Sequence, residues 1–136
     1  ETNRDARCAR AVGLIDLYPT LVELCGLPPK EGLEGRSLVP LLREPQRPWP
    51  YPALTTQQPG NHSVRTEDCR YIRYANGDEE LYDHRSDPHE LHNLAGDSRH
   101  RAVKEDLARD VPKTNAPYGP RLPTGKTEFE FDWTKP

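Results

Sequence analysis

The chain has 136 residues, of which only 33% are hydrophobic and 15 are proline, which predicts a small core surrounded by long irregular connections. Its 19 basic and 22 acidic residues are interspersed and give a net charge of -3, which excludes the broad basic field of a nucleic-acid-binding protein. No apolar run approaches the roughly 20 residues of a membrane span. We therefore expect neither nucleic acid nor a membrane as a partner.

The sequence begins at Glu1 and contains no methionine, and we interpret it as the tail of a longer protein. It has three cysteines, an odd number, at positions Cys8, Cys25 and Cys69, without the close C-x-x-C spacing of metal ligands. We therefore expect neither a disulfide framework nor a zinc site, but small thiols that are buried or half-buried.

The N-terminal third predicts one strand and two short helices. The apolar run 11–15 favours a terminal strand, and Asp16 can then cap a helix that has Pro19 in its first turn. Leu17, Leu21 and Leu24 share one face of this helix, and Gly26 ends it. Ser37 can cap a second helix over 38–42, with Pro40 in its first turn. Four prolines in 44–52 then predict an extended connector.

The middle of the chain predicts an antiparallel sheet of about four strands, over 53–58, 63–66, 70–74 and from Glu80 to Asp83. A polar turn over 59–62 joins the first two strands, and Asn76-Gly77 is a strong hairpin signal before the fourth. A helix is expected to cover one face of this sheet, because four strands are near the minimum for a stable sheet.

That helix is predicted from Asp97 or Ser98 to Val111, with Val103, Leu107 and Val111 on one face and Glu105 to Arg109 as a surface pair. Pro112 ends it, and residues 112–136 read as an extended arm. Within the arm, the aromatic residues Phe129, Phe131 and Trp133 alternate with acidic residues. We expect this strand-like apolar edge to dock on the body of the protein. The fold class is therefore α+β.

The segment ELYDHRSDPHELHNLA, from Glu80 to Ala95, combines a short strand with a tight turn. Asp87-Pro88 supplies the turn, in which the Asp side chain caps nearby backbone N–H groups. Leu91 and Leu94 are then expected to return to the core. We interpret the segment as structural, closing the small sheet.

Three phrases in order, IDLYPTLVELCGLP, LEGRSLVPLL and LYD-x-x-x-DP-x-E-x-x-NLA, resemble the C-terminal part of type I sulfatases in the alkaline-phosphatase-like superfamily. GNHSVRTEDCRYIRY is similar to the iduronate-2-sulfatase-like members. The resemblance implies that 1–50 ends the large sulfatase domain and forms a connector, that 51–111 is the C-terminal subdomain, and that 112–136 is the arm.

The resemblance also implies a parent enzyme that hydrolyses sulfate esters of sulfated glycans, in a periplasmic, extracellular or lysosomal setting. Such sulfatases use calcium and a formylglycine made from a C/S-x-P-x-R motif. That motif is absent from this sequence, so the chain is expected to be inactive alone, with a missing N-terminal catalytic domain as its partner. Two alternatives are a free-standing module that binds anionic saccharides and the small domain of a related phosphodiesterase or phosphonate hydrolase.

The candidate substrate-binding residues are Asn61, His62 and Arg65. Asn and His can hydrogen-bond a hydroxyl or carboxylate, and Arg offers a planar fork suited to sulfate or carboxylate; Arg70 on the next strand could add a second fork. The resemblance suggests that Asn61 and His62 contact the non-sulfate part of a substrate at the pocket rim. The alternative interpretation is that all of these are ordinary solvated side chains.

A second polar cluster has enough donors for a metal but no ordered ligand spacing, and we expect no metal there. Turn and cap roles already account for much of this cluster, which consists of Asp83, His84, Asp87, His89, Glu90 and His92. No catalytic residue is assigned to the chain.

Overall fold

The computed structural model describes residues 5–116, so the aromatic edge expected around Phe131 lies outside the described residues. The helices of residues 5–116 all lack the length and apolar character that a membrane crossing requires. In chain order the elements are η1 (Leu14–Asp16), α1 (Leu17–Leu24), α2 (Val39–Arg43), β1 (Ala53–Thr56), β2 (His62–Arg65), β3 (Cys69–Arg73), β4 (Glu79–Asp83), η2 (Ser98–His100) and α3 (Arg101–Ala108).

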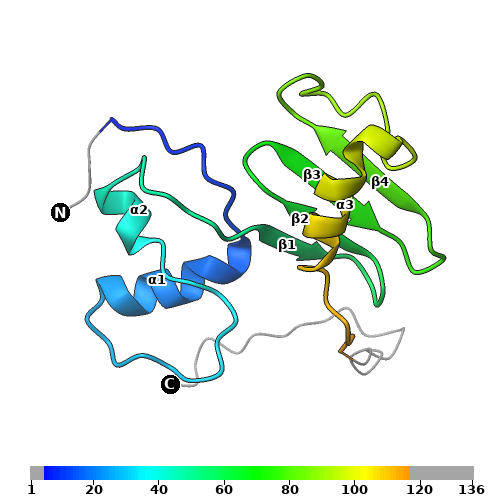
Figure 1. Ribbon diagram of the computed structural model, residues 1–136. Helices are drawn as coiled ribbons and strands as arrows, with labels where there is room; N and C mark the ends of the chain where they lie inside the picture. Colours follow the sequence, from blue (N-terminus) through cyan, green and yellow to red (C-terminus); the bar gives the residue numbers. More distant parts are fainter. Residues whose placement is uncertain (1–4, 117–136) are drawn as a thin grey trace, which may run out of the picture.

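The four strands form one antiparallel sheet in the order β1-β2-β3-β4, and α3 lies across one face of it (Figure 1). Val64, Tyr71 and Leu81 lie side by side on three neighbouring strands, and each is at most 2% exposed. Leu107 of α3 and Val111 beyond it complete this core. The expected α+β class and four-stranded sheet are therefore confirmed. The sheet can pack against one helix because every second residue of β2, β3 and β4 points to the same apolar face.

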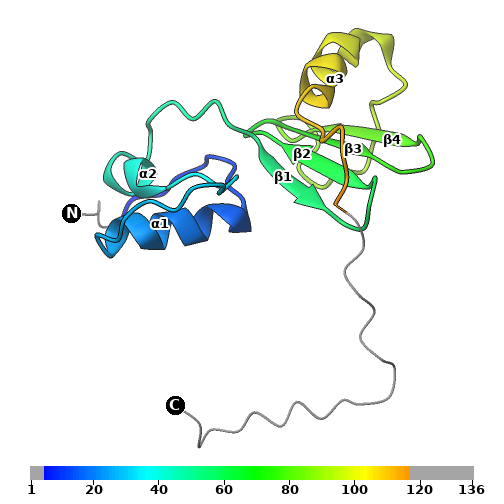
Figure 2. The same cartoon turned by 90° about the horizontal axis from the view of Figure 1, so that it is seen from below.

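The N-terminal helices lie beside the β1 edge of the sheet and are joined to it by the proline-rich connector (Figure 2). α1 ends as expected at Gly26, whose φ of +65° is in the left-handed region. The N–H of Leu27 reaches the carbonyl of Val22 at 3.0 Å, which closes the helix end with a Schellman pattern. The Ser37 hydroxyl accepts from the N–H of Val39 at 3.2 Å at the start of α2.

The strand expected at 11–15 is wrong, because residues 14–16 form a 3₁₀ turn. Asp16 also does not cap α1: its carboxylate accepts from the N–H groups of Gly13 and Arg36, both at 2.8 Å. The reason is the close approach of the loop at Gly35, where a Cβ would lie 2.1 Å from the Ile15 carbonyl oxygen. Asp16 therefore holds this loop against the start of the helix.

The segment after β4 protects an edge of the sheet. The Asn93 side-chain oxygen accepts from the N–H of Leu81 at 3.1 Å, and the N–H of Leu94 donates to the Leu81 carbonyl at 2.8 Å. Asp87 caps as expected, accepting from the N–H of His92 at 2.8 Å. Leu94 packs on the core, but the prediction for Leu91 is wrong, since it is 74% exposed. The asparagine and Leu94 thus satisfy backbone groups that an edge strand would leave open.

Two further expectations need correction. α3 ends at Ala108, and Val111 reaches the core through a tighter last turn in which its N–H bonds to the Ala108 carbonyl at 3.3 Å. Glu105 pairs with Arg101 at 2.7 Å instead of Arg109, because Arg109 lies beyond the regular helix and pairs with Asp106.

The three thiols are free, but only Cys69 is buried. The expected burial is wrong for Cys8 and Cys25, because one lies in the irregular N-terminal segment and the other at the exposed end of α1.

Candidate functional site

The turn between β1 and β2 is a tightly constrained loop. Gln58 and Gly60 have φ values of +64° and +85°, in the left-handed region that favours glycine. A Cβ at Gly60 would lie 2.9 Å from the Cβ of Ala75, so the turn packs directly against the β3–β4 hairpin. The Asn61 side-chain oxygen accepts from the N–H of Ala75 at 3.1 Å and fixes this contact.

His62 is buried at 3% exposure, and both of its ring nitrogens have hydrogen-bond partners. Nδ1 lies 2.9 Å from Thr56 Oγ1, and Nε2 lies 2.9 Å from Asn115 Oδ1. The N–H of Gly60 also donates to Asn115 Oδ1 at 2.8 Å. Because a backbone N–H can only donate, that Asn115 atom is an acceptor, and His62 Nε2 must carry the proton. His62 thus ties the segment after α3 to the turn.

Arg65 lies at the other end of β2, on the sheet face away from α3. Its guanidinium is about half exposed and stands 3.7 Å from the carboxylate of Glu90. His62 and Arg65 are three residues apart in one strand, so their side chains point to opposite faces, roughly 10 Å apart along the strand. The structure therefore places Asn61 at the end of the turn and His62 at the start of β2, next to each other, and leaves Arg65 in a separate cluster.

Glu90 is the centre of that cluster. Arg70 donates to it at 2.9 Å, and His84 Nε2 contacts it at 2.7 Å. Burial by itself would raise the pKa of Glu90, but the contacts with His84 and Arg70 together lower it. Arg70 also donates to Ser63 at 3.1 Å. The cluster cross-links two strands with the loop after β4, and its basic groups share one carboxylate.

Over residues 5–116, no group of three or more His, Cys, Asp or Glu side chains is arranged to hold a metal ion. The acidic members of the polar cluster in 83–92 act within the protein. Asp83 accepts from the backbone N–H of Arg85 at 3.0 Å, and Asp87 accepts from the backbone after it. Hydrogen bonds from Arg85 lower the pKa of Asp83.

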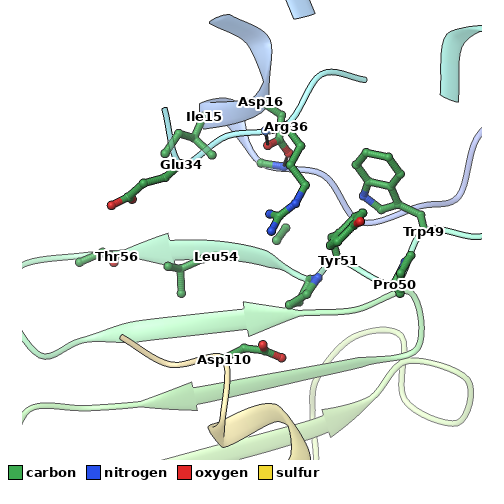
Figure 3. A pocket seen from close by; sticks show the side chains of 13 residues that line it. Ile15, Asp16, Glu34, Arg36, Trp49, Pro50, Tyr51, Leu54, Thr56 and Asp110 are labelled. Carbon is green, nitrogen blue, oxygen red and sulfur yellow. Dashed lines mark hydrogen bonds between the residues drawn. The ribbon is translucent and has the colours of Figure 1, made fainter. Parts of the chain in front are cut away.

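A cavity of about 490 Å³ lies between the N-terminal segment and β1, and Figure 3 shows its lining. The connector provides Trp49 and Tyr51, whose rings meet edge to face with centroids 5.0 Å apart. The Arg36 guanidinium lies 4.2 Å from the centre of the Tyr51 ring. Sequence reasoning missed this cavity, because its residues come from separate stretches of the chain that only the fold brings together. It also missed Asn115, which lies 53 residues from His62 and carries no local signal.

The fold is shared with solved hydrolases. It matches a 2-O GAG sulfatase at 30% identity with a TM-score of 0.55, covering 69% of this chain and 22% of that one. A phosphonate monoester hydrolase from Agrobacterium radiobacter matches at 28% identity with the same TM-score, covering 69% of this chain and 23% of that one. These neighbours agree with the expected alkaline-phosphatase-like superfamily.

Residues 2–116 match the family described as N-sulphoglucosamine sulphohydrolase, C-terminal, and the chain belongs to this family. A sulfatase from Formosa agariphila is 38% identical over 107 residues, which is 79% of this chain and 21% of that protein. The chain spans about a fifth of the length of the curated relatives it matches. The predicted relationship to sulfatase C-terminal regions is therefore confirmed.

Proposed function

We propose that this chain is the C-terminal region of a sulfatase that hydrolyses sulfate esters of sulfated glycans. The match of residues 2–116 to the C-terminal family of sulphohydrolases is the observation that carries the proposal. The likeness to a solved 2-O GAG sulfatase supports glycans as the substrate class. The division of the chain at about residues 50 and 111 is part of this proposal.

The chemistry in this proposal belongs to a separate catalytic domain. The sequence has no C/S-x-P-x-R motif to yield formylglycine, and the described residues do not fit a calcium site. Formylglycine and calcium, which the family uses, would therefore be supplied by that domain. The chain itself would contribute packing and part of the pocket rim, and would be inactive alone.

The exposed face of α1 supports a catalytic domain as the partner. Its large apolar side chains are each more than half exposed, and they are Leu17, Tyr18, Leu21 and Leu24. Contiguous exposed apolar surface of this kind is typical of an interaction site. In the proposed sulfatase, the large domain covers this face.

We further propose that the turn carrying Asn61 and His62, together with Arg65, forms part of the substrate rim. His62 is buried, so it would act by holding Asn115 and the turn in place, while Arg65, about half exposed beside Glu90, would present its guanidinium to an anionic group. In the complete sulfatase, His62→Ala is expected to lower kcat/KM, and His89→Ala, an exposed histidine, serves as the control. Equal kcat/KM for both variants would remove the rim role.

The likeness to a phosphonate monoester hydrolase favours a second candidate, the same region of a phosphonate hydrolase. The complete protein separates the two when it is offered a sulfated glycosaminoglycan disaccharide and an aryl phosphonate monoester at equal concentration. A higher kcat/KM for sulfate release than for hydrolysis of the phosphonate supports the sulfatase. Preference for the phosphonate would replace it with the second candidate.

A further inference from the structure

The cavity beside β1 is assembled from four separate stretches of the chain. Ile15 and Asp16 come from η1, Glu34 and Arg36 from the loop before α2, the aromatic pair from the connector, Leu54 and Thr56 from β1, and Asp110 from the turn after α3. Its volume of about 490 Å³ lies within the range of small-molecule sites. Convergence of this many segments gives a shaped site whose position depends on the whole fold.

The lining combines an aromatic wall with hydrogen-bonding groups. Trp49 and Tyr51 meet edge to face, and the Arg36 guanidinium lies over the Tyr51 ring at 4.2 Å, so the Trp49 indole provides the flat apolar surface. Glu34 and Asp110 are exposed at the cavity and can accept hydrogen bonds. A sugar ring suits such a lining, because it has an apolar C–H face and a rim of hydroxyl groups.

The charges around the cavity determine which sugar it accepts. The cavity lining contains three carboxylates, of Asp16, Glu34 and Asp110, and one guanidinium, of Arg36. A second hollow of about 290 Å³ shares the connector wall and adds the carboxylates of Glu67, Asp68 and Asp106 beside Arg10. A sulfate or carboxylate in the ligand would therefore be repelled, whereas hydroxyl groups would be accepted.

We propose that this cavity is a secondary sugar-binding site that takes a pyranose unit without a sulfate or carboxylate group. The ring stacks on the Trp49 indole, Arg36 donates to its oxygen atoms, and Glu34 and Asp110 accept from its hydroxyl groups. The site differs in charge preference from a sulfatase pocket. It holds an unsulfated unit of a glycan and is independent of hydrolysis.

The test is a titration of the isotope-labelled full chain, followed by NMR through the backbone N–H signals of Tyr51 and Leu54, which line the cavity and are retained in every variant. The matched ligands are N-acetylglucosamine and N-acetylglucosamine 6-sulfate. We expect saturable binding of the first, with a Kd on the order of millimolar, and binding of the second that is about tenfold weaker. Trp49→Ala should lose binding, whereas Trp49→Phe should retain most of it.

A charge variant tests the site without removing its wall. Asp110→Asn should reduce the ratio of the two Kd values by about threefold, because one carboxylate that repels the sulfated sugar is gone. Glu31→Gln, in an exposed loop outside the cavity, should leave the difference unchanged. The proposal is overturned if neither sugar gives a saturable shift, if the sulfated sugar binds as tightly as the unsulfated one, or if Asp110→Asn has no effect on their ratio.

Discussion

Replacing Glu79 with glutamine should destabilise the chain by removing a half-buried ionic link between β4 and α3. Lys104 donates to one Glu79 oxygen at 2.8 Å and to the Ala95 carbonyl at 3.0 Å, while the Tyr71 hydroxyl donates to the other Glu79 oxygen. Hydrogen bonds to charged groups contribute about 1.5–3 kcal/mol. The Glu79 side chain is 33% exposed, and solvent screening therefore reduces the expected loss in the free energy of unfolding to about 1–2 kcal/mol.

The loss should depend on pH in a defined direction. Hydrogen bonds from Lys104 and then Tyr71 lower the pKa of Glu79 from its ordinary value of 4.5. A carboxylate with a lowered pKa in the folded state stabilises that state above the unfolded pKa, and the contribution is lost as the pH falls through the folded pKa. Burial and then Glu79 raise the pKa of Tyr71, so this hydroxyl stays protonated and keeps donating. The difference between wild type and Glu79→Gln should therefore be largest at pH 7 and shrink below about pH 4.

Urea unfolding of the full chain, followed by circular dichroism at pH 7 and pH 3, measures this difference. Glu105→Gln is the matched control, since Glu105 pairs with Arg101 at 2.7 Å on the exposed side of α3 and should leave stability unchanged. A Glu79→Gln variant as stable as Glu105→Gln at pH 7 would refute the reasoning. So would a loss that persists undiminished at pH 3.

Three further outcomes are expected. Leu107→Ala should cost about 2–5 kcal/mol in urea unfolding, because Leu107 is 5% exposed in the core, whereas Val103→Ala, at a side chain 41% exposed, should cost under about 0.5 kcal/mol. Similar losses for the two variants would contradict the packing of α3. Gly60→Ala should lower the thermal midpoint, since φ is +85° and the new methyl would lie 2.9 Å from Ala75; an unchanged midpoint would contradict this turn geometry. Iodoacetamide should modify exposed Cys25 long before Cys69, whose burial raises its thiol pKa; equal rates by mass spectrometry would show that Cys69 is accessible.

Much of the fold could be predicted because its signals are local. The alternation around Val64 and Tyr71, the Asn76-Gly77 turn and the glycine after α1 each act within a few residues, and each lies where the pattern placed it. The errors arise where a distant segment changes a local preference. Asp16 looks like a helix cap, but the loop at Gly35 approaches closely enough to take its carboxylate.

The candidate site was harder to predict for the same reason. A histidine in a polar turn gives no sign that Asn115, 53 residues later, will meet its ring. The cavity lining likewise depends on Arg36 meeting Tyr51 of the proline-rich connector, and no local pattern predicts that contact. Residue type identified chemically capable groups, but only the folded arrangement separated buried His62 from exposed Arg65.

The strand order β1-β2-β3-β4 has a kinetic consequence. Each strand pairs with the next one along the chain through a short turn, so most sheet contacts are between residues close in sequence. Low contact order of this kind favours rapid folding. The sheet can therefore assemble late in synthesis without waiting for distant segments, and it offers α3 a finished surface as soon as that helix emerges.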